Sequence, residues 1–270
     1  MRTYRLKWIV LVAAFVAPLV AQAHKMWLLP SATTVAGTDP WITVDAAISN
    51  DLFHADHHPA SLDRLVITAP DGHTARPANP ATGKYRSVFD LHLDQQGTYK
   101  LALIGEGLLA NYELDGQKKR WRGSGDELAT AIPPRATRVQ VTLSSSRVET
   151  FVTNGKPNDA ALRPTGKGLE LVPVTRVTDL VAGEPATFRL LLDGKPADGL
   201  KVMAIAGGTR YRNAQNELAT HTDKDGAFRL TWPHAGMYWL NVATEDKHGP
   251  SGLAHTRRLS YTATLEVLPE

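Results

Sequence analysis

The chain has 270 residues, of which 43% are hydrophobic and 21% charged, and it contains no cysteine. This composition is typical of a globular protein long enough for two modest domains, and it excludes a disordered tail, a collagen and a coiled coil. Without cysteine the chain has no disulfides, thiolate zinc sites, iron–sulfur ligands or thiol nucleophiles, so its chemistry must use nitrogen and oxygen groups. The 30 basic residues exceed the 27 acidic ones by three, and this surplus lies within the first seven residues.

The first 23 residues have the pattern of a secretory signal peptide. Residues 1–7 carry three basic side chains, residues 8–20 form an apolar run too short for a span of about 20 residues, and residues 21–23 offer a small-x-small cleavage site. We predict cleavage after Ala23 and no stable membrane insertion of the mature chain, which begins at His24. Its basic and acidic residues then balance, which argues against a nucleic-acid partner. An exported protein without cysteine fits the bacterial periplasm.

Short β-rich runs between turn signals predict an all-β chain. No segment after residue 24 keeps an apolar period of 3.6 residues over three turns. Turn dipeptides such as Asp71-Gly72 and Asp225-Gly226 separate the runs, because glycine accepts the positive φ of tight hairpins. The predicted strands are residues 41–48, 64–68, 87–93, 99–104, 139–143 and 150–153 in the first half, and 169–174, 187–192, 201–206, 227–232, 237–243 and 261–268 in the second.

Weak sequence similarity between the two halves predicts two β-sandwich domains with related folds. Gln96-Gly-Thr-Tyr99 precedes a strand in the first half as Ala235-Gly-Met-Tyr238 does in the second. We expect a first sandwich at residues 24–154, a linker rich in glycine and proline at 155–168, and a second sandwich at 169–270.

One segment of the first sandwich departs from the strand pattern. Residues 105–137 fit neither a strand nor a long helix and are interpreted as an inserted excursion. Its basic stretch, residues 117–122, is typical of a solvated loop. The three serines at residues 144–146 follow a predicted strand and indicate a turn.

The clearest chemical signal comes from histidines near the predicted mature N-terminus. Cleavage after Ala23 gives His24 a free α-amine, which can close a chelate ring on a metal together with the imidazole Nδ1 of the same residue. A second cluster has three histidines and two carboxylates within residues 51–58. In a helical turn His54 and His58 would share one face, and in a loop the same density still allows the side chains to converge. The predicted metal ligands are His24, His54, His57, His58 and Asp56.

The alternatives to metal ligation are a cleavage site of no further consequence at residue 24 and a polar surface loop at residues 51–58. Amine, imidazole and carboxylate ligands suit Ni²⁺, Co²⁺, Cu²⁺ and Zn²⁺, and they suit Ca²⁺ and Mg²⁺ poorly. A hydrolytic enzyme has little support, because the sequence has no Gly-x-Ser-x-Gly, no His-Glu-x-x-His and no phosphate-cradling glycine-rich turn.

Several short motifs follow one another in an order that carries a family resemblance. They include Ala23-His24-Lys-Met-Trp27, Asn50-Asp-Leu-Phe53, Gly97-Thr-Tyr99, Thr222-Asp-Lys-Asp-Gly226 and Gly236-Met-Tyr238. Over essentially the whole mature chain they resemble the NikM-like family of exported bacterial proteins of unassigned function. The resemblance implies immunoglobulin-like or prealbumin-like β-sandwiches and a periplasmic protein associated with nickel or cobalt uptake. The Ala-His-x-x-Trp motif falls on His24, and the resemblance supplies no catalytic residue.

Three functions are open at this point. The first is a non-enzymatic periplasmic protein that captures or delivers a divalent transition metal, with Ni²⁺ or Co²⁺ favoured and a membrane transporter or receptor component as partner. The second is an adaptor module for a transporter, receptor or polysaccharide, which would act through residues 105–137. The third is a copper oxidase, because the chain resembles lytic polysaccharide monooxygenases in placing a histidine at the start of a β-sandwich.

Overall fold

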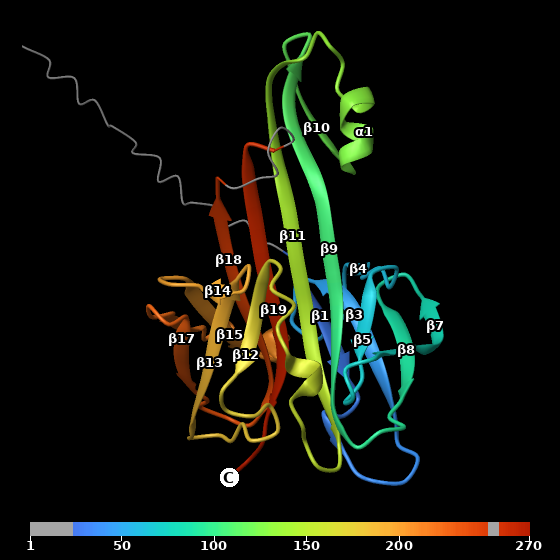
Figure 1. Cartoon of the computed structure of the whole chain (residues 1–270), viewed down its shortest axis with the longest axis vertical. Coiled ribbons are helices and arrows are strands. Elements are labelled where there is room, and N and C mark those ends of the chain that lie inside the picture. The colour runs from blue at the N-terminus through green and yellow to red at the C-terminus, as the bar shows by residue number, and fades with distance from the viewer. Residues whose placement is uncertain (1–23, 248–253) are drawn as a thin grey trace, which may run out of the picture.

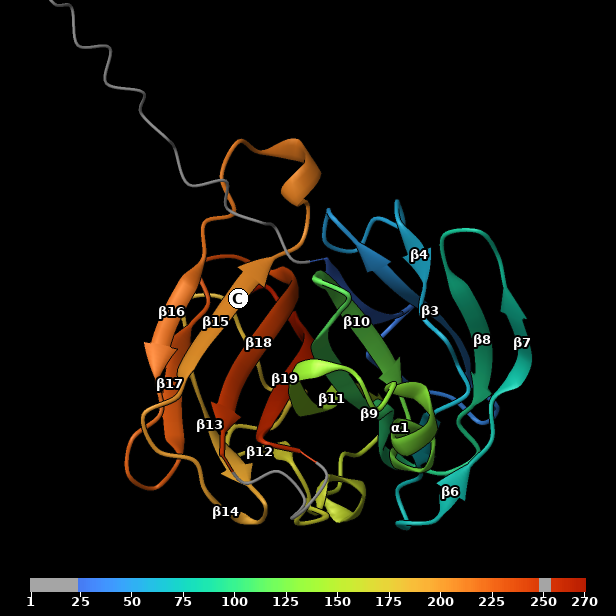
Figure 2. The ribbon, with the colours of Figure 1, turned by 90° about the horizontal axis from the view of Figure 1, so that it is seen from above.

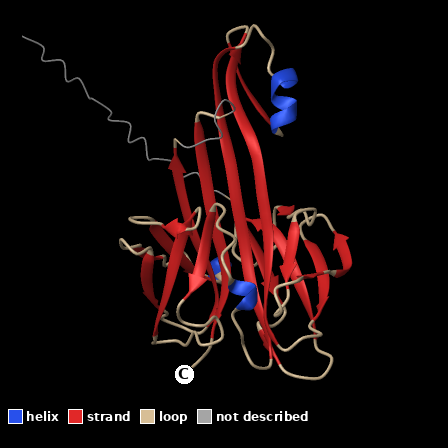
Figure 3. Cartoon of the chain, in the orientation of Figure 1, coloured by secondary structure: helices blue, strands red, loops and turns tan. Residues whose placement is uncertain are grey.

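The computed structural model describes residues 24–247 and 254–270, which are almost entirely strands and connecting loops (Figure 3). The predicted signal peptide, residues 1–23, lies outside the described residues. The all-β prediction is confirmed, since the helical segments of the described chain are one α-helix and two 3₁₀ turns. No helix among these residues is long and apolar enough to cross a membrane. The helical segments are α1 (Gly125–Ala131), η1 (Ala160–Leu162) and η2 (Thr209–Tyr211).

The first half of the chain forms a five-stranded antiparallel sheet in the order β1-β3-β8-β7. The short strand β4 pairs with the end of β3 that extends beyond β8. Ile42, Val44 and Ala46 of β3 are buried because alternate residues of a strand point to the same face. The strands are β1 (Lys25–Pro30), β3 (Trp41–Ser49), β4 (His58–Pro59), β7 (Ala78–Thr82) and β8 (Ser87–His92).

A ten-stranded sheet runs through both halves in the order β16-β15-β18-β19-β11-β9-β5-β6, with β10 beside β9 and β2 beside β11. The halves join where β11 pairs with β19 in parallel. Thr150, for example, lies opposite Thr264, which is far from it in the sequence. Figure 1 shows β9 and β11 crossing the whole molecule and ending in an arm that carries β10 and α1. The strands are β2 (Thr34–Val35), β5 (Leu65–Thr68), β6 (Thr74–Ala75), β9 (Gly97–Leu114), β10 (Gln117–Gly123), β11 (Thr137–Asn154), β15 (Lys201–Ala206), β16 (Leu218–His221), β18 (Gly236–Asp246) and β19 (Thr256–Val267).

The second half adds a four-stranded sheet, in which β13 pairs with β12, β14 and β17. The hairpin before β17 requires glycine at Gly226, because its φ is +70° and a Cβ there would lie 2.4 Å from the carbonyl oxygen of Leu190. The predicted turn at Asp225-Gly226 therefore has the expected backbone. The strands are β12 (Leu169–Pro173), β13 (Pro185–Leu192), β14 (Lys195–Pro196) and β17 (Ala227–Thr231).

The two smaller sheets pack on opposite faces of the ten-stranded sheet. Val148 and Val152 of β11 belong to the core of the first half, whereas Phe151 belongs to the core of the second half together with Tyr261 of β19. Because neighbouring residues of a strand point to opposite faces, β11 contributes to both cores. The result is two β-sandwiches that share one sheet, and the view from above shows them side by side (Figure 2).

A buried ionic cluster lies where β11, β12 and β19 meet. Arg147 lies 3.2 Å from Glu149 and 3.6 Å from Glu170, and the hydroxyl of Tyr261 donates a hydrogen bond of 2.7 Å to Glu149. Glu170 also accepts hydrogen bonds from the backbone N–H groups of Thr165 and Gly166. Every carboxylate of this cluster thus has donors that offset its loss of hydration.

The structure corrects the interpretation of residues 105–137 as an excursion without strands. β9 continues through Leu114, β10 spans Gln117–Gly123, and β11 begins at Thr137. The serine turn is also wrong, since residues 144–146 lie within β11 and pair with β9 on one side and β19 on the other. In both cases the hydrogen bonds of a long sheet hold residues whose side chains have little β propensity.

Candidate functional site

The end of β3 places two histidine-bearing segments on its two sides. β1 pairs along one side, with Lys25 opposite Ser49, so that His24 precedes the first pair. β4 pairs along the other side, with His58 opposite Ile48. The antiparallel register thus brings the start of the described chain to the same end of the sheet as residues 57 and 58.

Three of the predicted ligands gather at this point. The ring centroids of His24 and His57 are 3.7 Å apart with an interplanar angle of 16°, and those of His57 and His58 are 4.1 Å apart at 51°. Partial desolvation, followed by the neighbouring His24 and His58, lowers the pKa of His57, while Asp56 acts in the opposite direction. This environment favours the neutral imidazole, which is the form that binds metals.

The other two predicted ligands have different contacts. Arg210 of η2 donates a hydrogen bond to Nε2 of His54, and the Oδ1 atom of Asp56 accepts one of 2.9 Å from the N–H of Asn50. The helical arrangement of His54 and His58 is not present, because residues 54–56 have no regular structure and His58 begins β4. The structure thus brings together His24, His57 and His58 and engages His54 elsewhere.

The loop that carries these histidines is attached to the second half of the chain. The N–H of Leu52 donates a hydrogen bond of 2.9 Å to the hydroxyl of Thr209. Leu52 also packs in a small apolar cluster with Trp27 of β1 and Trp239 of β18, and the indole of Trp239 donates to the carbonyl of Met26. These contacts fix the loop beside β1 and thereby hold His57 next to His24.

The histidine rings are stacked rather than aimed at a common point. Across residues 24–247 and 254–270, no three His, Asp or Glu side chains are already arranged around a metal position. His24 and His58 are exposed, so rotation of their side chains meets little resistance. Ligation by this cluster therefore requires the rings to turn.

A cavity of about 550 Å³ opens on the same face of the ten-stranded sheet as the first core. On this face of β9 the side chains change from Leu103, in the core, to Gly105 and Gly107, and on β11 they change from Val148 to Ser146 and Ser144. Each glycine pairs directly with one of the serines. The cavity exists because small residues follow on this face where Leu103 and Val148 fill the space over the first core.

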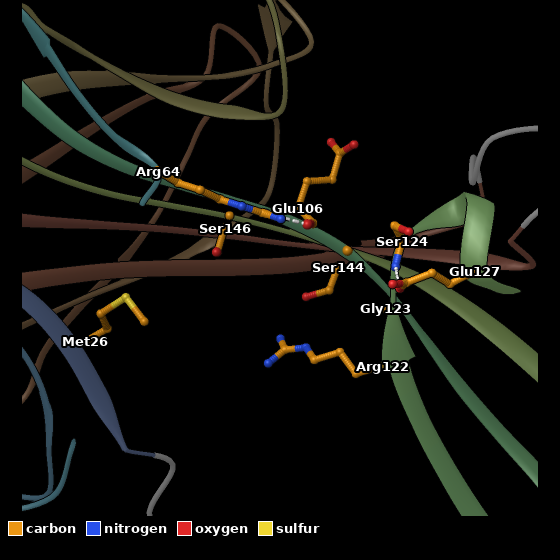
Figure 4. A pocket seen from close by; sticks show the side chains of 11 residues that line it. Met26, Arg64, Glu106, Arg122, Gly123, Ser124, Glu127, Ser144 and Ser146 are labelled. Carbon is orange, nitrogen blue, oxygen red and sulfur yellow. Dashed lines mark hydrogen bonds between the residues drawn. The ribbon is translucent and has the colours of Figure 1, made fainter. Parts of the chain in front are cut away.

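Polar groups from several elements line this cavity (Figure 4). Arg64 enters from the residue before β5 and donates a hydrogen bond to the carbonyl of Glu106. Arg122, at the end of β10, extends its guanidinium toward Ser144, and Met26 of β1 forms the opposite wall. An adjoining cavity of about 290 Å³ shares Met26 and Arg64.

Sequence reasoning missed this cavity. The sequence pattern predicts a turn at its serines and a solvated loop at Arg122, because the predicted strands 99–104 and 139–143 end before these residues. The available signal was the matched spacing of Gly105-x-Gly107 and Ser144-x-Ser146, which is visible only once the two strands are known to pair.

Comparison with known proteins yields one family. The family model described as "Domain of unknown function (DUF4198)" matches residues 21–246. No curated protein matches the chain. The match spans both halves of the described structure and carries no statement of activity.

Solved structures with some likeness to the chain have low sequence identity. The D0-D1 domain of intimin is 12% identical, with 89% of this chain and 97% of that chain covered and a TM-score of 0.23. Trypsin-activated alpha-2-macroglobulin from Escherichia coli is 13% identical, with coverage of 92% and 16% and a TM-score of 0.22. Dimeric latent PorU from Porphyromonas gingivalis is 13% identical, with coverage of 88% and 20% and a TM-score of 0.18. The function therefore has to be argued from the residues of the site.

Proposed function

The chain belongs to the DUF4198 family, and we propose that it is an exported, non-enzymatic protein that binds a divalent transition metal for uptake or delivery. The proposed ligands are the α-amine and imidazole of His24 together with the imidazoles of His57 and His58. The observation that carries the proposal is the close approach of these three rings, which come from two segments on either side of β3.

The donor set suits this role. An α-amine and an imidazole on one residue form a chelate, and two further imidazoles complete a set of nitrogen ligands for Ni²⁺, Co²⁺, Cu²⁺ or Zn²⁺. The NikM-like resemblance favours Ni²⁺ or Co²⁺ as the cargo. Because His24 and His58 are exposed, the metal would exchange with solution or with a transporter partner. We assign Asp56, through its hydrogen bond to Asn50, to orienting the loop.

The proposal includes export to the periplasm and cleavage after Ala23. Only a chain that begins at His24 has the α-amine at this position. Any residue retained before His24 converts the amine into an amide, which no longer offers a basic nitrogen to a metal.

Calorimetric titration with Ni²⁺, Co²⁺, Cu²⁺ and Zn²⁺ tests the proposal. The protein that begins at His24 is compared with a form that has one extra alanine before His24. We expect one metal ion per chain, with affinity at least about tenfold lower in the extended form and in the H57A/H58A double variant. H54A is the matched control, because His54 contacts Arg210, and it should bind as the unmodified protein does.

Equal binding by the extended and unextended forms would show that the α-amine of His24 is not a ligand. Absence of stoichiometric binding for all four ions would overturn the proposal and favour the adaptor function. A preference for Cu²⁺, with hydrogen peroxide formed above a free-copper control in the presence of a reductant, would favour the copper oxidase instead.

A further inference from the structure

We propose that the cavity between β1, β9, β10 and β11 binds a small organic anion that carries two or more carboxylate groups. This inference is independent of metal binding by His24, His57 and His58. It rests on the charge, the unused hydrogen-bonding groups and the size of the cavity.

The charge comes from two guanidinium groups. In the described part of the chain, no hydrogen bond or ion pair engages the guanidinium of Arg122, which points into the space between Ser144 and Met26 in Figure 4. Arg64 donates to the carbonyl of Glu106, which fixes its position and leaves further N–H groups for a ligand. Planar guanidinium groups bind carboxylates through paired hydrogen bonds, so two arginines from different segments of the chain suit two carboxylates.

The acidic residues nearby do not neutralise Arg122. The side chain of Glu106 is exposed and points away from Arg122 in Figure 4. The carboxylate of Glu127 accepts a hydrogen bond of 2.9 Å from the N–H of Ser124 at the edge of the cavity. The two guanidinium groups are therefore the groups of the lining that can receive a carboxylate.

The floor of the cavity supplies neutral donors. Ser144 and Ser146 lie two residues apart on one face of β11, and neither hydroxyl has a hydrogen-bond partner among the described residues. Opposite Ser144, Gly107 leaves the backbone of β9 open, so that a ligand can approach the sheet closely, whereas the hydroxyl of Ser146 lies over Gly105.

The size and the apolar wall indicate an organic ligand. A volume of about 550 Å³ exceeds what an inorganic oxyanion needs and falls within the usual range for small-molecule sites. Met26 supplies a surface for a carbon skeleton. Met26 also lies two residues after His24, so ligand and metal would bind near the same end of β1.

Titration of the metal-free full mature chain with citrate tests this inference. We expect saturable binding that weakens at least about tenfold in R122Q, because a charge-assisted hydrogen-bonded pair is lost. R120Q is the matched control, since Arg120 lies two residues away on the same exposed face of β10 and does not line the cavity. It should bind citrate within about twofold of the unmodified protein.

A second variant tests whether binding depends on the open volume of the cavity, without changing the charge of its lining. A Cβ at Gly107 would meet only the carbonyl oxygen of Gly123, at 3.5 Å, so G107V should fold normally, fill the cavity and abolish citrate binding. Citrate binding should persist in H57A/H58A, which separates this inference from the metal proposal. Absence of saturable binding, or equal losses in R120Q and R122Q, would overturn the inference.

Discussion

The β9–β11 pair has two regions that share one hydrogen-bonded ladder and differ in what covers it. In the lower region, residues 97–104 and 147–154, both faces are packed, and Tyr99, Leu101 and Val152 are fully buried. In the upper region, residues 105–114 and 137–146, one face carries the glycines and serines of the cavity. The other face has a small apolar cluster around Leu108 and Val141.

The difference shows that a strand's contribution to stability depends on which side chains pack against its faces. Backbone pairing continues without interruption from the lower to the upper region, so the ladder alone does not separate them. The lower region buries apolar side chains in two cores and should carry most of the free energy of unfolding. The upper region has exposed polar groups and space, which are the features of a binding surface.

The largest effect should come from the buried charges of the lower region. Arg147→Met leaves Glu149 and Glu170 buried without their cation, and we expect the free energy of unfolding to fall by about 3–5 kcal/mol. Arg138→Met is the matched control in the upper region. Its partner Glu113 is 2.9 Å away, but the side chain of Arg138 is 79% exposed, so its loss should cost less than about 1 kcal/mol.

Urea unfolding of both variants measures this difference. Similar losses in R147M and R138M would contradict the assignment of stability to the lower region. The charge network would then be no more stabilising than an exposed pair.

A second comparison uses adjacent positions on one face of β11. Val148 is buried in the first core, so Val148→Ala should cost about 2 kcal/mol through lost burial and the space left behind. Ser146→Ala, two residues away and lining the cavity, should change stability by less than about 0.5 kcal/mol. Thermal and urea unfolding check the pair. A costly S146A would show that the serine is structural and would weaken its role in ligand binding.

The lower region was largely predictable from the sequence, whereas in the upper region only residues 139–143 were predicted as a strand. Apolar residues such as those of 99–104 and 150–153 identify strands because burial imposes the pattern. Gly105, Gly107 and the serines of β11 break that pattern because no core covers them. The parallel pairing of β11 with β19 joins residues more than a hundred positions apart, and no local signal indicates it.

The histidine cluster was predictable in part for a related reason. The density of histidine at residues 54–58 and the position of His24 after a cleavage signal are properties of the sequence itself. Their proximity depends on β1 and β4 pairing with the two sides of β3, which the strand pattern did not indicate. The engagement of His54 by Arg210 depends on a loop of the second half, 156 residues away.

Acid should weaken the lower region through Glu170. Burial acts to raise the pKa of Glu170, but hydrogen bonds from Thr165 and Gly166 together with the charge of Arg147 outweigh it and hold the pKa below its ordinary value of 4.5. A lowered folded-state pKa stabilises the protein above 4.5, and this contribution is lost as the pH falls toward the folded-state pKa. The urea midpoint should fall as the pH is lowered below 4.5, and E170Q should show a smaller fall. Equal falls of the urea midpoint with pH in both proteins would exclude Glu170 as the source of the acid sensitivity.

The smallest global effect should come from the apolar cluster of the upper region. Leu108→Ala removes a buried side chain, but its cluster is small and can open locally while the lower region stays folded. We expect a loss of less than about 1 kcal/mol in the global free energy of unfolding, below the usual range for a buried leucine. Hydrogen exchange should accelerate in residues 105–123 and 137–146 and stay unchanged in residues 97–104. Uniform acceleration over both regions, with a loss of about 3 kcal/mol, would mean that the arm and the shared sheet unfold together. In that case the cavity would be supported by the same cooperative unit as the two cores.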